Sequence, residues 1–196
     1  MAETSTLRDR RRHQTEREIQ RAAVSLAIEQ GYCALTTDLI ATRAGISLRT
    51  FFNYYPNKDA ALVGPFTPIS EESKQLFREA TGTLIDDLFD VVARQLAAKS
   101  LDRELISMIG ELLETSPELL AIYHAPLEKV HNDLVALAQE RAPSEDLHAL
   151  HLLAHTVTYA VSTAFHRWAT DDAMTQDQLV VQARSYVDRL GLLLKS

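Results

Sequence analysis

The chain has 196 residues, enough to bury a hydrophobic core as one domain or two small ones, and its six Gly and six Pro leave a composition that favours helices. The polar N-terminal stretch MAETSTLRDRRRHQ excludes a signal peptide, and no apolar run is long enough for a membrane span. The single Cys33 excludes an internal disulfide and indicates a cytoplasmic protein, in which we expect Cys33 to be a small core residue.

The formal net charge of −7 is unevenly distributed along the chain. Residues 1–60 carry nine Lys or Arg against seven Asp or Glu, whereas residues 61–196 carry eleven against twenty. Four of the N-terminal cations are clustered at Arg8, Arg10, Arg11 and Arg12. A basic end on an acidic body indicates that the N-terminal part meets phosphate, with a solvated tail as the alternative.

The first predicted helix covers residues 7–30 and ends at Gly31, a residue typical of helix C-termini. Its apolar positions recur every three or four residues, which predicts one buried stripe. The stripe comprises Ile19, Ala22, Ala23, Leu26 and Ala27.

Three short helices follow in the next thirty or so residues. We expect Thr37 to cap a helix that runs to Arg43, Ser47 to cap one that Pro56 stops, and Asn57 to cap one that reaches Val63. Proline residues at positions 65 and 68 then interrupt the chain. The predicted domains are therefore residues 1–64 and residues 65–196.

The second predicted domain is also all-helical, since no strand alternation or internal repeat is visible. Its expected helices cover 70–81, 83–99, 102–115, 117–140, 144–169 and 175–195. Ser116, Ser144 and Thr175 are plausible N-caps, and Thr175 with Gln178 matches a capping box. Pro126 should kink the helix that contains it.

Residues 36–59, TTDLIATRAGISLRTFFNYYPNKD, predict a helix-turn-helix. Such a motif needs a small residue where two short helices cross and glycine where the backbone turns, and Ala41 and Gly45 have that spacing. The apolar positions Ile40, Ala44, Ile46, Phe51 and Tyr55 should pack inward. The outward side should then carry Ser47, Leu48, Arg49, Thr50, Phe52, Asn53 and Tyr54. A plain helical hairpin with a solvated arginine is the alternative.

Residues 15–64 resemble the TetR family of transcriptional regulators, most specifically in LTTDLIATRAGISLRTFFNYYPNKDAAL. The resemblance implies a three-helix DNA-binding domain followed by an all-helical domain that binds a small ligand and dimerises. Two features depart from the family pattern. Proline residues interrupt the link after the fourth helix, and Asp38 stands where some members have a basic, base-reading residue, so no operator sequence can be carried over.

The recognition chemistry can be assigned by residue type. A helix that opens at Ser47 would enter the major groove with its first turn, where Arg49 can bond a guanine edge with two donors. Leu48 and Phe52 offer apolar surface to thymine methyl groups. Phosphate contacts are expected from Thr50, Asn53 and Tyr54 and from residues at helix N-termini, namely Thr37, Ser47 and Lys58. The expected partner is a palindromic double-stranded DNA operator.

The helices over 144–169 and 175–195 carry apolar stripes that usually indicate intrachain core. The resemblance favours a homodimer interface built from these two helices of each subunit. The stripes are Leu150, Ala154, Val157, Val161, Ala164 and Trp168 in one helix, and Leu179, Ala183, Tyr186, Leu190 and Leu193 in the other.

The expected effector is an apolar or aromatic small molecule that lowers operator affinity. Large apolar residues of the middle helices and a few polar groups would surround it. The candidate ligand-binding residues are Met108, Tyr123, His131, His155, Tyr159 and Trp168. A DNA-binding protein that senses nothing, or a helical bundle that binds only protein, are the alternatives.

Histidines raise one enzyme hypothesis. Glu128/His131 and Glu145/His148 have the Glu-x-x-His spacing of di-iron bundles, and His148, His151 and His155 share a helix face. However, His131 and His148 would miss the same level by roughly 7 Å at 1.5 Å per residue. We therefore expect no metal, no cofactor and no catalytic residues, and we expect these histidines to line the dimer seam or the ligand cavity.

A cluster of acidic residues, Asp86, Asp87 and Asp90, lies in the expected helix 83–99. It is interpreted as a solvated helix face, with attraction of a cationic ligand as the alternative.

Overall fold

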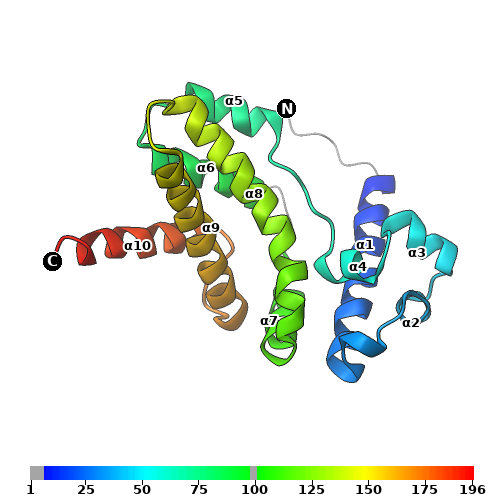
Figure 1. Ribbon diagram of the computed structural model, residues 1–196. Helices are drawn as coiled ribbons and strands as arrows, with labels where there is room; N and C mark the ends of the chain where they lie inside the picture. Colours follow the sequence, from blue (N-terminus) through cyan, green and yellow to red (C-terminus); the bar gives the residue numbers. More distant parts are fainter. Residues whose placement is uncertain (1–6, 98–100) are drawn as a thin grey trace. The chain divides into compact units, whose positions relative to one another are not determined.

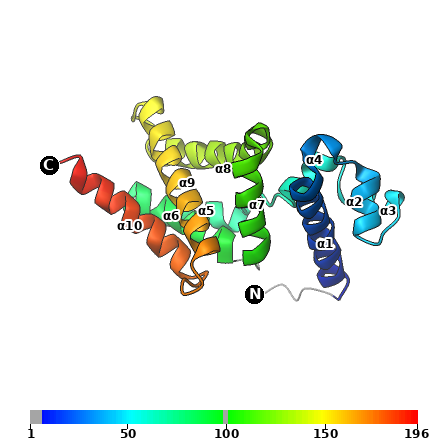
Figure 2. The ribbon, with the colours of Figure 1, turned by 90° about the horizontal axis from the view of Figure 1, so that it is seen from below.

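The computed structural model describes residues 7–97 and 101–196, and the regular elements within these ranges are all helical (Figures 1 and 2). The helices are α1 (Leu7–Gln30), α2 (Thr37–Arg43), α3 (Leu48–Tyr54), α4 (Lys58–Val63), α5 (Glu71–Glu79), α6 (Leu84–Ala97), α7 (Arg103–Thr115), α8 (Leu120–Arg141), α9 (Leu147–Thr170) and α10 (Gln178–Leu193). Two 3-10 turns lie at Tyr32–Ala34 and Pro117–Leu119. The all-helical class predicted from the sequence is confirmed. The last two positions of the predicted helix 83–99 lie outside the described residues.

The chain forms two compact units. One comprises Met1–Phe66 with Met108–Tyr123, and the other comprises Thr67–Ser107 with His124–Ser196. The predicted division between residues 64 and 65 stays a prediction. Within the parts that the structure describes, no helix is both long enough and apolar enough to cross a bilayer.

In the first unit, α1 supplies the surface on which α2 and α4 pack. Its residues Ile19, Ala23 and Leu26 are buried, as their spacing predicts. The buried Gln20 side chain donates to the carbonyls of Leu62 and Val63 at 3.1 and 3.0 Å. These carbonyls belong to the last turn of α4, where no intrahelical donor reaches them, so Gln20 ties the end of α4 to α1.

Gly64 ends α4 with a backbone angle φ of 80°, in the region that favours glycine. A Cβ atom at this position would lie 2.3 Å from the side-chain oxygen of Gln20. Glycine is therefore required both by the backbone and by the tie from α1. The chain then runs without regular structure until α5 begins at Glu71, which confirms the predicted break around Pro65 and Pro68.

In the second unit, arginines hold α6 through its acidic face. Arg141 of α8 donates to the buried Asp87 carboxylate and to a backbone carbonyl. Arg184 of α10 donates to Asp86 and Asp90, both at 2.6 Å. The interpretation of this face as solvated is wrong for Asp87. The carboxylates of this cluster pair with arginines of the same chain, and such pairing is typical of a buried carboxylate like that of Asp87.

The apolar stripe of α9 lies in the core of the second unit rather than on a dimer face. Leu150, Val157 and Trp168 are at most 4 % exposed and pack with residues of α6 and α8. In α10 the stripe divides, because Leu179 is fully buried whereas Leu193 is 72 % exposed. The prediction that both stripes form the dimer interface is wrong for these buried residues, because periodicity marks the apolar side of a helix but not the chain that covers it.

Two helix starts differ from the sequence prediction. The N-cap of α2 is Thr36, whose hydroxyl accepts an amide of the first turn at 3.2 Å, so Thr37 is the first helical residue instead. The N-cap of α9 is Asp146 rather than Ser144, and its carboxylate accepts two amides at 2.8 and 3.1 Å. Asp146 directly precedes Leu147, the first helical residue, whereas Ser144 lies two residues further back.

The predicted cap at Thr175 is only partly present. The Thr175 amide donates to the Gln178 side chain at 2.9 Å, as a capping box requires, but α10 begins at Gln178 and its N-cap position is Asp177. Ser116 precedes the 3-10 turn at Pro117–Leu119, and its side chain makes no capping hydrogen bond. Ser47 and Asn57 are the caps of α3 and α4, as predicted.

Candidate nucleic-acid interface

Helix α3 is anchored by aromatic residues on its inner side. Phe51 is fully buried and Tyr55 is 4 % exposed, while the Tyr55 hydroxyl donates to the Glu16 carbonyl of α1 at 3.2 Å. Burial raises the pKa of the Tyr55 phenol. The hydroxyl therefore stays protonated and remains a donor, which holds the end of α3 against α1.

The turn between α2 and α3 depends on Gly45, whose φ of 68° lies in the left-handed region. The Ile46 amide donates to the Ala41 carbonyl at 3.0 Å and so closes the end of α2. Ile40 and Ala41 are buried at the crossing, while Ile46 is half-buried. The predicted helix-turn-helix and its inward residues are therefore present.

The outer side of α3 presents a mixture of polar, cationic and apolar groups. Leu48 is 36 % exposed and Phe52 is 51 % exposed, and Ser47, Arg49 and Asn53 are exposed beside them. Within the described ranges, the Arg49 guanidinium makes no hydrogen bond or ion pair. It is therefore available to a partner, whereas Leu48 and Phe52 form apolar surface on a helix that is otherwise polar outside.

Three further predicted contacts on α2 and α3 are half-buried, namely Thr37, Thr50 and Tyr54. The hydroxyls of Ser47 and Thr50 lie 2.8 Å apart, and Ser47 also accepts the Thr50 amide. Tyr54 lies under the guanidinium of Arg12, at 5.7 Å from its ring centroid. Thr37 is half-buried in the first turn of α2. Thr37, Ser47 and Thr50 thus lie at or in the first turns of α2 and α3, the ends of helices that favour phosphate, whereas Tyr54 ends α3. Their contacts with phosphate stay a prediction.

The basic run at the N-terminus is helical in this structure. Arg8, Arg10, Arg11 and Arg12 lie on the first turns of α1 and are exposed. Arg12 donates to Glu16 at 3.1 Å in addition to its position over Tyr54. The alternative of a wholly solvated tail therefore does not describe Arg12, whose charge lies next to the end of α3.

Lys58 is placed differently from the prediction. Its ammonium donates to the carbonyls of Tyr32 and Leu35, both at 3.1 Å, and lies 4.1 Å from the Tyr32 ring centroid. Its charge is therefore directed into the unit as well as toward solvent. The contact of Tyr32 with Lys58 is not among the sequence predictions. The sequence feature that marks Tyr32 is its position directly after Gly31, the glycine that ends α1.

An ion pair that the sequence analysis did not identify joins α1 to α2. Arg43 donates two hydrogen bonds to the Glu29 carboxylate, at 2.8 and 2.7 Å. This pairing lowers the pKa of Glu29 and raises that of Arg43. The bidentate geometry fixes the end of α2, although both side chains are substantially exposed and so stabilise the unit only modestly.

Cys33 is exposed, and its prediction as a core residue is wrong.

The six candidate ligand-binding residues do not all lie in one unit. Met108 and Tyr123 belong to the first, where the Tyr123 hydroxyl donates to the Leu62 carbonyl at 2.9 Å. Burial raises the pKa of Tyr123 and so keeps this donor protonated. Tyr159 is 78 % exposed and Trp168 is buried in the second unit, with the Arg103 guanidinium 4.5 Å from the Trp168 ring centroid.

His131 and His155 do come together in the second unit. Their rings stack at 3.8 Å, and the buried His131 Nε2 lies 3.0 Å from His151 Nδ1. Burial, followed by the neighbouring imidazoles, lowers the pKa of His131, while Glu128 opposes this effect. His131 therefore meets histidines one and two turns beyond His148, in agreement with the axial offset that argued against a di-iron site. Among the described residues, no group of three or more His, Cys, Asp or Glu side chains could hold a metal ion.

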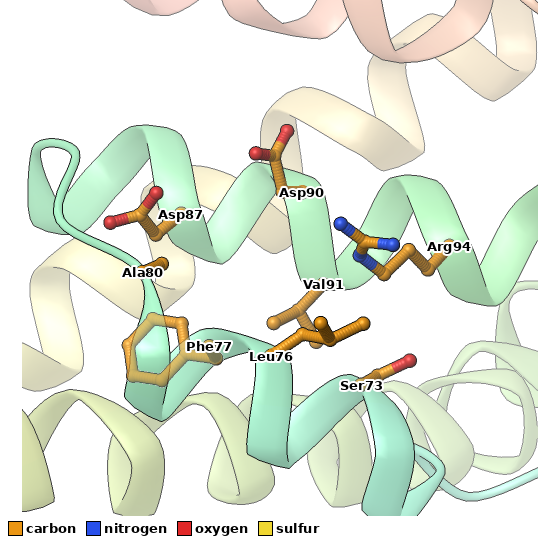
Figure 3. A pocket seen from close by; sticks show the side chains of 8 residues that line it. All are labelled: Ser73, Leu76, Phe77, Ala80, Asp87, Asp90, Val91 and Arg94. Carbon is orange, nitrogen blue, oxygen red and sulfur yellow. The ribbon is translucent and has the colours of Figure 1, made fainter.

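Two hollows in the second unit are lined by other residues. Figure 3 shows the one between α5 and α6, about 30 Å³ in volume, which has room for little more than water. It is lined by Ser73, Leu76, Phe77, Ala80, Asp87, Asp90, Val91 and Arg94. The other is an open groove of about 340 Å³ where α9 turns into α10. It is lined by Arg167, Asp171, Ala173, Met174, Gln178, Val181, Gln182 and Ser185.

The anchored inner side, the glycine turn and the exposed outer side of α3 together define a helix-turn-helix protein. Comparisons with known proteins agree. Residues 19–62 match the family described as "Bacterial regulatory proteins, tetR family". An uncharacterized HTH-type transcriptional regulator, YdeS of Bacillus subtilis, is 34% identical over 74 residues, which cover 38% of this chain and 36% of that protein.

Solved structures share the fold of the whole chain at low identity. A TetR-family regulator structure from Mesorhizobium loti is 18% identical, with a TM-score of 0.51, over 91% of this chain and 96% of that one. A transcriptional regulator structure from Pseudomonas aeruginosa is 17% identical, with a TM-score of 0.55, over 90% of each chain. Residues 19–62 are thus similar to the TetR family of bacterial regulatory proteins, and the all-helical fold is similar to that of solved TetR-family regulator structures.

Proposed function

We propose that the chain regulates transcription by binding a double-stranded DNA operator through α3. The observation that carries this proposal is the exposed Arg49, which has no partner among residues 7–97 and 101–196. It lies in the first turn of a helix whose inner side is fixed by Phe51 and Tyr55. A guanidinium held on a rigid helix can bond the O6 and N7 atoms of one guanine. An arginine on a flexible segment would lose this advantage to conformational entropy.

The other exposed groups of α3 suit the same role. Leu48 and Phe52 can contact thymine methyl groups, while Asn53 can reach a phosphate oxygen. Thr37, Ser47 and Thr50 lie at helix N-termini, where backbone amides favour phosphate, and the Tyr54 hydroxyl can donate to a phosphate oxygen. The chain's net charge of −7 makes such local cationic and polar groups necessary, because the acidic body repels DNA.

We further propose that two copies bind a palindromic operator, joined through α9 and α10. The side of α9 opposite its buried stripe carries exposed apolar groups, with Leu152 at 68 % and Tyr159 at 78 % exposure. Val181 and Leu193 of α10 are similarly exposed, at 66 % and 72 %. Large apolar side chains exposed on two helices that pack together are typical of an interface, and a twofold dimer matches inverted half-sites.

Binding is proposed to respond to an apolar or aromatic effector, with a coupling on the order of 1–3 kcal/mol. Support comes from His131 and His155, which stack in the second unit beside apolar core residues. The two hollows described above are lined by residues other than the six candidates, and a DNA-binding protein without an effector is the alternative. Thermal-shift screening, followed by DNA titration with each hit, separates these two functions.

The family is one of regulators and not typically of enzymes, and we propose no catalytic or cofactor role. A cytoplasmic location fits DNA binding. Selection from a random-sequence duplex library with the full-length protein tests the proposal. We expect an enriched inverted repeat with half-sites about one helical turn apart. Recovery of no sequence preference, while the protein is folded, would contradict it.

A further inference from the structure

Both ends of the helix-turn-helix segment meet at one place in the first unit. The chain leaves α1 through the 3-10 turn Tyr32–Ala34 and, after α2 and α3, returns at Lys58 in the first turn of α4. The Lys58 ammonium donates to the carbonyls of Tyr32 and Leu35, both at 3.1 Å. These bonds span 26 and 23 positions of the chain, so one side chain closes a loop that contains the whole motif.

The next residue adds a second tie to the same turn. Asp59 accepts a hydrogen bond from the Tyr32 hydroxyl at 2.8 Å, and this bond raises the pKa of Tyr32 to about 12. The Lys58 ammonium also lies 4.1 Å from the centroid of the Tyr32 ring, a distance at which the ring attracts a cation. Tyr32 is thus held at its carbonyl, its ring and its hydroxyl by two consecutive residues of α4.

We propose that Tyr32, Lys58 and Asp59 form a closure clamp that positions α2 and α3 for base recognition, with Lys58 acting as a positioning residue rather than a phosphate contact. This inference rests on the proposed DNA-binding function. It differs from the sequence prediction, which assigned Lys58 to phosphate. It also gives a role to Tyr32 and Asp59, which the sequence analysis left without one.

The geometry favours positioning for a physical reason. A lysine ammonium has three donors, and two of those of Lys58 are already bonded to carbonyls. Moving the ammonium to a phosphate would leave these carbonyls without that donor and remove the cation from the ring. Releasing the clamp would instead free the turn directly before Thr36, the cap of α2, and α3 packs on α2. Small displacements of α3 change base contacts more than contacts to the uniform phosphate backbone.

The test compares two variants on two duplexes. Lys58→Met removes the ammonium, and Tyr32→Phe removes only the bond to Asp59 while Lys58 keeps its charge. Lys74→Met in α5 is the control for loss of one lysine. Each full-length protein is titrated at several salt concentrations, with a duplex enriched by the wild type from a random library and with a scrambled duplex of the same composition.

Removing one hydrogen bond costs about 1 kcal/mol, which corresponds to roughly a fivefold loss of affinity. We expect about this loss for Tyr32→Phe on the enriched duplex and a larger one for Lys58→Met, with at most about twofold change on the scrambled duplex. The salt dependence should stay at the wild-type slope for both. If Lys58→Met instead weakens both duplexes equally and lowers the slope by about one, while Tyr32→Phe changes nothing, Lys58 is a phosphate contact and the clamp is refuted.

A second measurement tests the clamp without DNA. In amide hydrogen exchange, both variants should accelerate exchange of peptides that cover residues 32–54, while peptides from α6 keep the wild-type rate. Wild-type rates throughout residues 32–54 would overturn the clamp. If the wild type enriches no duplex, the proposed DNA-binding function fails, and hydrogen exchange still decides whether the clamp exists.

Discussion

Replacing Arg49 by alanine should remove sequence preference without disturbing the fold. The side chain is exposed and, among the described residues, its guanidinium has no hydrogen-bond or ion-pair partner, so truncation breaks no contact of the folded protein. A bidentate arginine–guanine pair discriminates against the wrong base by about 1–3 kcal/mol. We therefore expect roughly a 5- to 150-fold loss of affinity on the enriched duplex and little change in the free energy of unfolding.

A double-mutant cycle measures this contact directly. The enriched duplex is compared with one in which 7-deazaguanine replaces single guanines, which removes the N7 acceptor alone. Where Arg49 bonds that guanine, the base change should weaken the wild type but barely affect Arg49→Ala, so the two effects are not additive. Arg49→Lys is the matched control, since it keeps the charge but lacks the planar fork.

Two outcomes would contradict base recognition by Arg49. Equal losses on the enriched and the scrambled duplex for Arg49→Ala would show that Arg49 contributes charge and not base recognition. Full retention of preference in Arg49→Lys would show that the two-donor geometry is irrelevant. Either result would move base recognition to other residues of α3.

Three further predictions concern the scaffold. Arg141→Met should lower the free energy of unfolding by about 3 kcal/mol in urea titrations, because it leaves the buried Asp87 carboxylate unpaired. Adding Asp87→Leu should recover most of this loss, and a double variant whose loss equals the sum of the two single losses would contradict the pairing. Gly64→Ala should lower the free energy of unfolding by about 1–3 kcal/mol, because of the backbone angle of Gly64 and the close Gln20 amide. Gly191→Ala, which has open space around it, should be neutral or stabilising, and equal effects of the two substitutions would contradict strain at Gly64. The folded-state pKa of His131 is lowered, so the contribution of this residue to stability is complete above the unfolded pKa near 6.5 and is lost as pH falls through the lower folded value. Unfolding followed by fluorescence should show this decline in stability, and His131→Leu should make the decline smaller.

The sequence predicted the helix-turn-helix well because local signals agree there. Gly45 requires a left-handed turn, Pro56 stops a helix, and Ser47 and Asn57 cap the helices that follow. Each of these effects acts within a few residues, so spacing alone locates it. The same locality explains the error at α2, where two consecutive threonines compete for one cap and Thr36 takes it.

Long-range partners could not be predicted from spacing. From the sequence, Lys58 is a cation at the start of a helix. Its hydrogen bonds to the carbonyls of Tyr32 and Leu35 form only because the chain returns to this place after more than twenty residues. In the sequence, Asp87 does not differ from Asp86 and Asp90, and only the structure shows that Arg141 of another helix donates to its carboxylate. A periodic pattern gives the direction of a side chain relative to its own helix, whereas its partner depends on the packing of other elements.

The candidate ligand-binding residues are defined by residue type, and type says little about position. Tyr159 and Trp168 both lie on α9, yet one is exposed and the other is buried in the core. His131 and His155 come together because α8 and α9 place them at the same level, an arrangement that helix rise only partly anticipates. The role of these residues in effector binding remains a prediction.

Guanine-methylation interference on the enriched duplex tests the central claim most directly, because methylation at N7 blocks the major groove alone. We expect methylation to interfere at guanines in two successive major grooves, on one side of the duplex and about one helical turn apart. We also expect Arg49→Ala to lose this interference at one symmetric pair of guanines. Insensitivity of the wild type to N7 methylation, or interference confined to a single groove, would contradict recognition of the major groove by α3 of a dimer.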